Sequence, residues 1–167
     1  SPIKSVLEPS RLRLYVLPTD LDINMHMNNG RYPTIMDLGR LDLLMRLGLM
    51  QMMWREKSVP VLSSIKMRFR LPLDLFQPYD LETRIVCWDE KWVYLEQHFV
   101  IVKGPKAGAV AAIGLIKGSF YSRKTSATVP TSEVLDLLDM ESESPPIPAH
   151  IYDWIDAEES LKAVTAA

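Results

Sequence analysis

Hydrophobic residues follow a helical period in one long segment near the start of the chain. From Tyr32 to Leu47 apolar side chains recur every three or four positions, and Gly48 can end the helix just beyond them. Leu38, Leu41 and Met45 widen the apolar stripe well beyond one narrow face. The pattern therefore predicts a long helix that is mostly buried.

Much of the remaining chain alternates apolar and polar residues or is rich in β-branched and aromatic residues, which predicts β-strands. Five segments show these patterns: Leu12–Leu17, Ile65–Leu71, Leu81–Trp88, Trp92–Val102 and Ala109–Tyr121. Only short turns separate the last four segments, so these strands are expected to pair antiparallel. In the second segment Lys66, Arg68 and Arg70 share one side, which predicts a strand face exposed to water.

An antiparallel sheet wrapped around one long apolar helix buries both elements, and we therefore expect an α+β fold of this kind. Beyond the strands, residues 132–140 predict a short helix and residues 141–148 a linker. Ile151, Trp154 and Leu161 mark a terminal amphipathic helix. We expect one domain at residues 1–125, with a C-terminal helical extension at residues 126–167 packed on it.

Composition and charge exclude several classes of partner. The chain has 167 residues, with 19 Lys and Arg against 21 Asp and Glu and a formal net charge of −2. A balance so near zero gives no general attraction to polyphosphate, so nucleic acid is not an expected partner. The longest apolar run, residues 107–116, is about half of the ~20 residues that span a bilayer, so no membrane span is expected.

Cysteine and histidine usage bears on the compartment and on cofactors. The single cysteine, Cys87, provides no disulfide framework, and the first residues show no basic region followed by a long apolar run. We therefore expect a cytoplasmic location. One cysteine and three scattered histidines cannot complete a four-ligand zinc site, and we expect neither a metal nor a cofactor.

The candidate chemistry lies in the polar loop Asp20–Gly30, immediately before the predicted helix. A helix N-terminus presents free backbone N–H groups and a partial positive charge, which suit an oxyanion or a polarised carbonyl. Asp22, Asn24 and His26 supply a base or nucleophile, an orienting amide and a second acid or base within a few residues. This combination suits acyl transfer to water.

A calcium loop is one alternative interpretation of the same residues. Asp20, Asp22 and Asn24 match the first, third and fifth positions of an EF-hand loop. Met25, however, stands where that loop needs glycine, and Arg31 stands where it needs a bidentate glutamate. The match to a calcium site is therefore poor.

Structural roles are a second set of alternatives. Asp and Asn before a helix often only cap its free N–H groups, and His26 can be an ordinary hydrogen-bonded histidine. Cys87 could be combined with His26 as a cysteine hydrolase, but its apolar strand I-V-C-W predicts a buried small hydrophobic residue. His98 and His150 have no acidic or cysteine neighbours in the sequence that single them out.

The run D-L-D-I-N-M-H-M-N-N-G-R-Y, from Asp20 to Tyr32, resembles the hot-dog-fold thioesterases, as do Asp37 and Arg40 farther along the helix. It is similar to the D-x-D-x-x-G-H-V-N-N-x-x-Y motif of the 4-hydroxybenzoyl-CoA thioesterase family. It is closer still to the D-L-D-x-N-x-H-V-N-N-x-x-Y loop of plant acyl-carrier-protein thioesterases. The order of strands and helix agrees with the hot-dog fold over residues 10–125, and the resemblance stops beyond Ser126.

This resemblance implies roles for individual residues. Asp22 matches the catalytic carboxylate, which acts as a nucleophile or as a general base on water. Asn24 and His26 match positions that orient water or substrate and help in proton transfer. Asn29 matches the position whose backbone N–H polarises the thioester carbonyl. The implied substrate-binding residues are Asn28 and Tyr32.

The sequence departs from the family pattern at two places. Met25 replaces the glycine that precedes the histidine in the bacterial enzymes. The plant-type site also draws on a glutamate in a later strand, and residues 69–73 contain no carboxylate. Glu96 lies on another strand, and its spacing does not show that it reaches the loop.

The resemblance implies an acyl-CoA thioesterase that forms free acid and CoA by carboxylate-assisted attack of water, with the carbonyl polarised at a helix N-terminus. The substrate is an acyl-CoA or an acyl-carrier-protein thioester, and the assembly is a homodimer or homotetramer that shares its site between subunits. Two alternatives remain open: a non-catalytic protein that binds acyl thioesters, and a hot-dog dehydratase acting on a hydroxyacyl thioester.

Overall fold

The computed structural model describes residues 5–140 and 143–166. Residues 1–4, 141–142 and 167 lie outside the described residues. The start of the expected N-terminal domain and the first two residues of the expected linker therefore receive no structural account.

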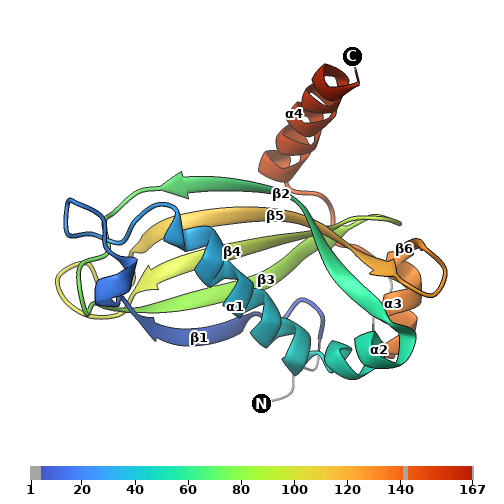
Figure 1. The fold of residues 1–167 in the computed structure, drawn as a ribbon, viewed down its shortest axis with the longest axis horizontal. Helices are drawn as coiled ribbons and strands as arrows, with labels where there is room; N and C mark the ends of the chain where they lie inside the picture. Colours follow the sequence, from blue (N-terminus) through green and yellow to red (C-terminus); the bar gives the residue numbers. More distant parts are fainter. Residues whose placement is uncertain (1–4, 141–142, 167) are drawn as a thin grey trace.

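The strands form one antiparallel sheet in the spatial order β1-β3-β4-β5-β2, and β6 pairs with β5 alone (Figure 1). β1 and β2 are therefore the two edges of the main sheet. In the described ranges the strands are β1 (Ser10–Tyr15), β2 (Ser58–Phe69), β3 (Pro78–Trp88), β4 (Val93–Ile101), β5 (Val110–Ser122) and β6 (Ala127–Val129).

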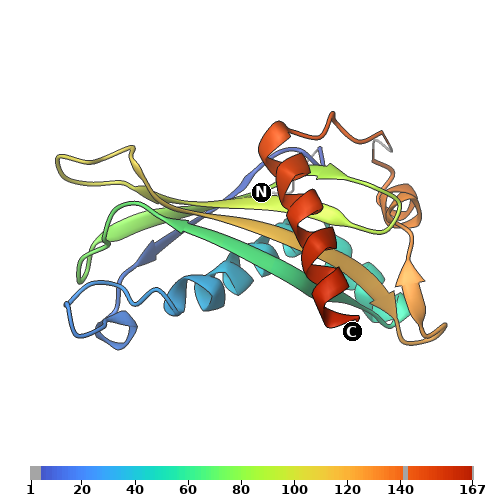
Figure 2. The same cartoon turned by 90° about the horizontal axis from the view of Figure 1, so that it is seen from above.

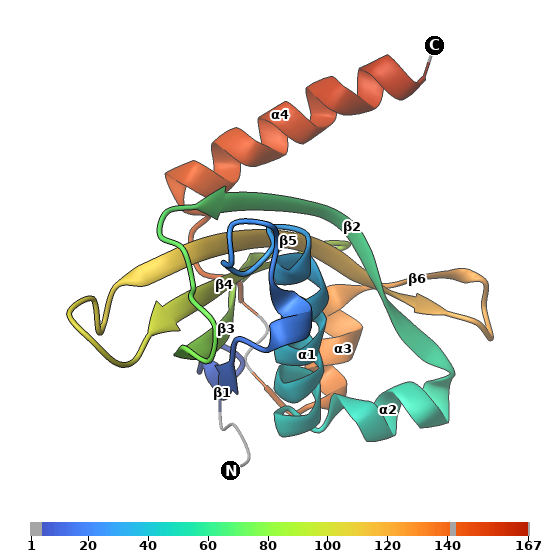
Figure 3. The same ribbon diagram turned by 60° about the vertical axis from the view of Figure 1, so that its left-hand side comes forward.

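One long helix lies inside the curl of this sheet, and a second long helix lies on the opposite side (Figures 2 and 3). The helices are η1 (Pro18–Asp20, a 3-10 turn), α1 (Arg31–Arg46), α2 (Leu49–Glu56), α3 (Thr131–Leu137) and α4 (Ala149–Thr165). None of the helices within the described ranges is long and apolar enough to cross a bilayer. The antiparallel sheet curled around α1 confirms the predicted α+β hot-dog fold.

Helix α1 lies directly against the strands because two glycines leave room for it. A Cβ atom on Gly39 would lie 2.6 Å from Thr83 Oγ1 and 2.7 Å from Gln97 Nε2. A Cβ atom on Gly114 of β5 would lie 2.8 Å from Met36 Sδ. The fully buried Gln97 side chain donates from Nε2 to the Met36 carbonyl and to Thr83 Oγ1, both at 2.9 Å. Hydrogen bonds and close packing therefore fix the middle of α1 on the sheet.

The expectation that α1 is mostly buried is wrong for one face. Leu38, Leu41 and Met45 are exposed to 48%, 42% and 52%. They point away from the strands, whereas Met36 and Leu43 on the sheet side are fully buried. The apolar surface of α1 is therefore larger than the part of it that the rest of the same chain buries.

Two elements near α1 differ from the sequence prediction. The pattern did not predict α2, because Gly48 marks a helix end; its left-handed backbone (φ 78°) ends α1 and at once begins α2. Strand β2 starts at Ser58 and contains Pro60, which normally breaks a strand. Proline is tolerated there because an edge strand needs only half of its backbone groups for pairing.

One part of the outer face of the sheet is exposed to solvent, and α4 covers another part. Lys66 and Arg68 on β2 and Arg70 just after it are exposed, as predicted. On the same side of the molecule, Ile151 and Trp154 of α4 pack in one cluster with Tyr94 of β4. Only the first two turns of α4 contribute fully buried side chains. Glu158 in the third turn accepts from Ser64 of β2 at 2.8 Å, and the end of the helix extends away from the body (Figure 3).

We expect Gly39→Ala to destabilise the protein. In a helix interior this change normally stabilises by about 1 kcal/mol. Here the new methyl group would meet Thr83, Gln97 and Leu81 at 2.6–2.7 Å, so overpacking should reverse the sign and cost about 1–3 kcal/mol. Urea unfolding measures the change, with Thr34→Ala on the exposed side of α1 as control. A stabilised Gly39→Ala variant would contradict the close packing described above.

Candidate functional site

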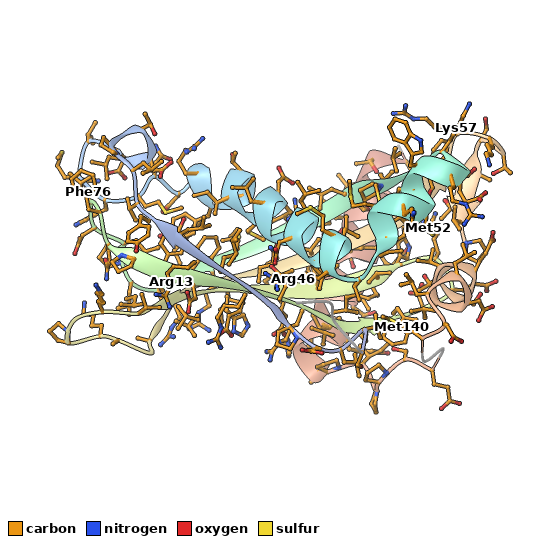
Figure 4. The ribbon with its side chains drawn as sticks, turned by 90° about the horizontal axis from the view of Figure 1, so that it is seen from below. Arg13, Arg46, Met52, Lys57, Phe76 and Met140 are labelled. Carbon is orange, nitrogen blue, oxygen red and sulfur yellow. The ribbon has the colours of Figure 1, made fainter. Side chains whose placement is uncertain are left out.

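The polar loop before α1 folds as a tight turn held against a second loop. Leu21 and Met27 form an isolated antiparallel bridge, and the Asp22 N–H donates to the His26 carbonyl at 2.9 Å. The Met27 N–H donates to the carbonyl of Leu73 in the β2–β3 loop at 2.9 Å. Both loops lie at the end of the molecule marked by Phe76 in Figure 4, and Met52 and Met140 lie at the other end. The candidate residues are therefore held by backbone pairing at one end of the sheet.

Asp20 ties this loop to the first turn of α1. Its side chain is only 4% exposed and accepts from Arg31 Nε at 2.9 Å through Oδ1. Its other carboxylate oxygen accepts from the Leu17 N–H at 2.9 Å, and its carbonyl accepts from the Asn28 N–H at 2.7 Å. A buried carboxylate held by these groups positions the loop and does not act on a substrate.

Asp22 is half-buried and keeps part of its carboxylate available. Oδ1 accepts from the Asn24 N–H at 2.8 Å, and Oδ2 has no hydrogen-bond partner in the part of the chain that the structure describes. The turn continues through Met25, whose backbone is left-handed (φ 61°). This conformation explains why glycine suits the position in the bacterial enzymes, since glycine alone adopts it without steric cost.

His26 faces a partner that the sequence analysis did not identify. His26 Nε2 lies 3.4 Å from Asp74 Oδ1, across the bridge that joins the two loops. The His26 side chain is 44% exposed and that of Asp74 is 69% exposed, so the pair is open to solvent. No local pattern marks Asp74, because its position depends on how the β2–β3 loop pairs with the polar loop.

The residues just before α1 differ in their hydrogen bonding. Asn28 Oδ1 accepts from the Gly30 N–H at 2.8 Å, and the Asn28 carbonyl accepts from the Arg31 N–H at 2.8 Å. Asn28 therefore forms a turn with Gly30 just before the helix, whose first residue is Arg31. Asn29 is exposed, and its N–H has no hydrogen-bond partner among the described residues. The free N–H can polarise a carbonyl oxygen that approaches the helix N-terminus.

Tyr32 belongs to the core beneath the loop. It is 2% exposed, and its ring makes edge contacts with Phe69 and Phe99 at centroid distances of 5.1 and 4.8 Å. Burial raises the pKa of its phenol to about 12. Tyr32 thus supports the first turn of α1 from below, and it is not among the described residues that line the cavity of about 380 Å³ beside the C-terminal half of that helix.

That cavity lies between the C-terminal half of α1, the first half of β2, the concave face of the sheet and α3. Almost all of its lining is apolar, and the charged residues among its described lining are Asp37 and Arg40. Arg40 donates to Gln97 Oε1 at 2.9 Å and pairs with Asp37, while burial lowers its pKa. A cavity of this size and polarity suits the apolar part of a small molecule.

Glu96 does not reach the polar loop, because it lies on the face of the sheet that carries α4. Its buried carboxylate contacts Arg84 Nη2 at 2.7 Å, His98 Nε2 at 3.1 Å and His150 Nε2 at 2.5 Å. The hydrogen bond from His98 holds the pKa of Glu96 well below its usual range, with further help from Arg84 and His150 and against the opposing effect of burial. The view that neither histidine has an acidic neighbour is therefore wrong: both are brought to Glu96 by the fold.

Cys87 lies in a buried strand outside the polar loop. Cys87 is fully buried, as predicted, and burial raises the pKa of its thiol to about 11. Across residues 5–140 and 143–166, no three acidic, histidine or cysteine side chains converge in a way that could hold a metal ion. The chemistry available at the loop is therefore that of a carboxylate, an imidazole and backbone N–H groups.

Comparison with known proteins identifies the family. Residues 16–155 match the thioesterase-like superfamily. The chain belongs to this superfamily. It is 33% identical to protein THEM6 of Xenopus laevis over 159 residues, which cover 95% of this chain and 72% of that protein.

A second relative is a probable thioesterase of Saccharomyces cerevisiae. It is 32% identical over 95 residues, which cover 56% of this chain and 41% of that protein. Among solved structures, the probable thioesterase YbaW of Escherichia coli aligns with a TM-score of 0.69 and 23% identity. The alignment covers 80% of this chain and 98% of that one, and it supports the hot-dog fold. This member of the thioesterase-like superfamily is a thioester hydrolase.

We expect Glu96→Gln to cost about 1–3 kcal/mol of stability at neutral pH, because hydrogen bonds to a charged group are lost. A depressed carboxyl pKa stabilises the folded state above the unfolded pKa of about 4.3, and this contribution disappears as pH falls through the folded pKa. The difference between wild type and variant should therefore be full at neutral pH and shrink in acid.

Urea unfolding, measured from neutral pH down into acid, gives the difference in the free energy of unfolding between wild type and variant. Glu82→Gln is the matched control, because Glu82 pairs with the exposed Arg11 and should lose only about 0–1 kcal/mol. A Glu96→Gln deficit that does not change with acidification would refute the role given to the charged carboxylate.

Proposed function

We propose that this thioester hydrolase acts on acyl-CoA, with Asp22 as the catalytic carboxylate. The observation that carries the proposal is the free Oδ2 of Asp22 in a loop that ends at the N-terminus of α1. The same helix borders an apolar cavity that suits an acyl group. An acyl-carrier-protein thioester remains the second substrate to test.

The proposed reaction requires only groups of this chain and water. Asp22 accepts a proton from water as the water oxygen bonds to the thioester carbon, and Asn24 and His26 orient the water or substrate. The free N–H of Asn29 stabilises the negative charge that develops on the carbonyl oxygen. The carbon–sulfur bond then breaks, and CoA leaves as a thiol after its sulfur takes up a proton. The products are a free carboxylic acid and CoA.

We expect Asp22→Ala to lower kcat by about 100-fold to 10,000-fold, the usual contribution of a positioned acid or base. Thiol release from octanoyl-, hexadecanoyl- and benzoyl-CoA measures the loss. Asp22→Asn is a second variant, because it keeps the turn that Oδ1 forms with the Asn24 N–H and removes the charge.

Cys87→Ala is the matched control, since its thiol is buried in a strand, and this variant should retain activity. Full activity in Asp22→Asn would refute the carboxylate role. A protein that binds but cleaves none of the acyl-CoA or acyl-carrier-protein substrates would be a binding module, and absorbance of an enoyl product would identify a dehydratase.

We also propose a homodimer built on the free edge of β2 and the exposed face of α1. Among the described strands β2 pairs with β5 alone, so its other edge is open to a second strand. Leu41 lines the same cavity as Val61 of β2, and it shares the exposed face of α1 with Leu38 and Met45. A two-fold axis here would run the two α1 helices antiparallel and bring the polar loop of one copy toward the cavity of the other.

We expect the double substitution Leu38→Glu and Met45→Glu to convert the dimer into a monomer, because charges would be buried in the interface. Light scattering after size-exclusion chromatography measures the mass. Leu161→Glu, on the exposed part of α4, is the control and should remain a dimer. A monomeric wild type would contradict this interface, and a tetramer would require a second one.

The domain boundary and the compartment are also part of the proposal. We assign residues 1–125 to the hot-dog unit and residues 126–167 to an extension that packs on it. The packing of α4 on Tyr94 and of Leu135 in one cluster with Trp88 supports this assignment. A cytoplasmic location is supported by the single reduced and buried cysteine, Cys87.

A further inference from the structure

The apolar cavity has an open side and a closed end. Asp37 and Leu41 of α1 and Val61 of β2 are all exposed, so the cavity meets solvent between these two elements. At its other end the lining residues are buried, including Val134 at 4% and Leu135 at 3% exposure. A ligand therefore enters beside Asp37 and ends against α3.

Helix α3 forms the closed end, and it comes from the part of the chain that follows the hot-dog strands. Val134 packs in one cluster with Leu43 of α1 and with Leu47 just after it, and Leu135 packs with Trp88 of β3. Figure 1 shows α3 below the right-hand end of the sheet, close to α2 and away from the polar loop. Side chains of the extension thus limit how far the cavity continues along α1.

We propose that α3 is the end wall of an acyl-chain site and sets the longest straight fatty-acyl chain that the enzyme accepts. This inference rests on the proposed acyl thioesterase function and adds a specificity determinant to it.

The chemistry of the lining selects an alkyl chain over other ligands. Apart from the paired Asp37 and Arg40 at the open side, the described lining offers few polar groups. Arg40 is already engaged by Gln97 and Asp37, so a polar head group gains little by moving inward. An apolar cavity without polar partners for water stays dry or takes an apolar ligand.

The length of α1 indicates which chains reach the wall. From its first residue to Asp37 the helix advances about 9 Å, and from Asp37 to Leu47 about another 15 Å. A short acyl group polarised at the helix N-terminus therefore stops before the cavity, whereas a long straight chain fills it. Each further methylene group that is buried should raise kcat/KM about fourfold until the chain meets α3.

Substitutions on α3 and just after it test the wall. Val134→Phe fills the closed end and should lower kcat/KM for hexadecanoyl-CoA at least tenfold while leaving octanoyl-CoA unchanged. Leu138→Ala opens the same end and should shift the optimum toward a longer chain. Leu137→Ala is the matched control, because Leu137 is 55% exposed and is absent from the described lining. Equal chain-length profiles in all three variants would overturn the proposal.

A binding measurement that needs no hydrolysis separates this proposal from the proposed function. Trp88 lines the closed end beside Leu135. A free fatty acid brominated near its methyl end should therefore quench Trp88 fluorescence, and the quenching should be lost in Trp88→Phe and reduced in Val134→Phe. The same acid brominated near its carboxylate should quench weakly.

The two proposals fail in different ways. If wild type cleaves no acyl thioester but shows this quenching, the proposed hydrolysis is wrong and the acyl-chain site stands. If it cleaves acyl-CoA without quenching, or if both brominated acids quench equally, the assignment of α3 as end wall is wrong.

Discussion

The buried contact between Gln97 and the middle of α1 is the interaction on which the rest of the structure depends. The Gln97 amide satisfies the Met36 carbonyl and Thr83 on one side and accepts from Arg40 on the other. It can do so only because Gly39 allows the helix to lie on the strands without a side chain between them. With its middle fixed, α1 presents its N-terminus at one end of the sheet and leaves unfilled space beside its C-terminal half.

As a result of this placement, the two ends of α1 have different surroundings. At its start, the buried Asp20 carboxylate connects η1, the polar loop and Arg31, so that Asp22 is presented by a scaffold that does not itself react. Toward its other end, the helix borders a space with almost no polar lining. Under the proposed function, the acid and base chemistry stays near water, and the apolar part of the substrate is kept away from it.

The sequence predicted the elements that depend on local patterns of residues. It missed the contacts that depend on how distant segments pair. The helix, the loop before it and the four later strands follow from periodicity and turn residues. Helix α2 was not predicted because Gly48 is typical of a helix end. The first residues of β2 were not predicted because a proline such as Pro60 normally breaks a strand. The pairings of His26 with Asp74 and of Glu96 with His150 join distant segments, so no spacing in the chain could reveal them.

Met25 has a consequence for how ready the loop is before any substrate arrives. Its left-handed backbone costs about 1–2 kcal/mol that glycine would not pay in the folded state. Glycine, however, gives the unfolded chain many more conformations to lose, and a loop with glycine at its apex also moves more freely once folded. A methionine at this position therefore adds backbone strain to the folded state but reduces the conformational entropy that the chain loses on folding. As a result, the turn between Asp22 and His26 is preorganised.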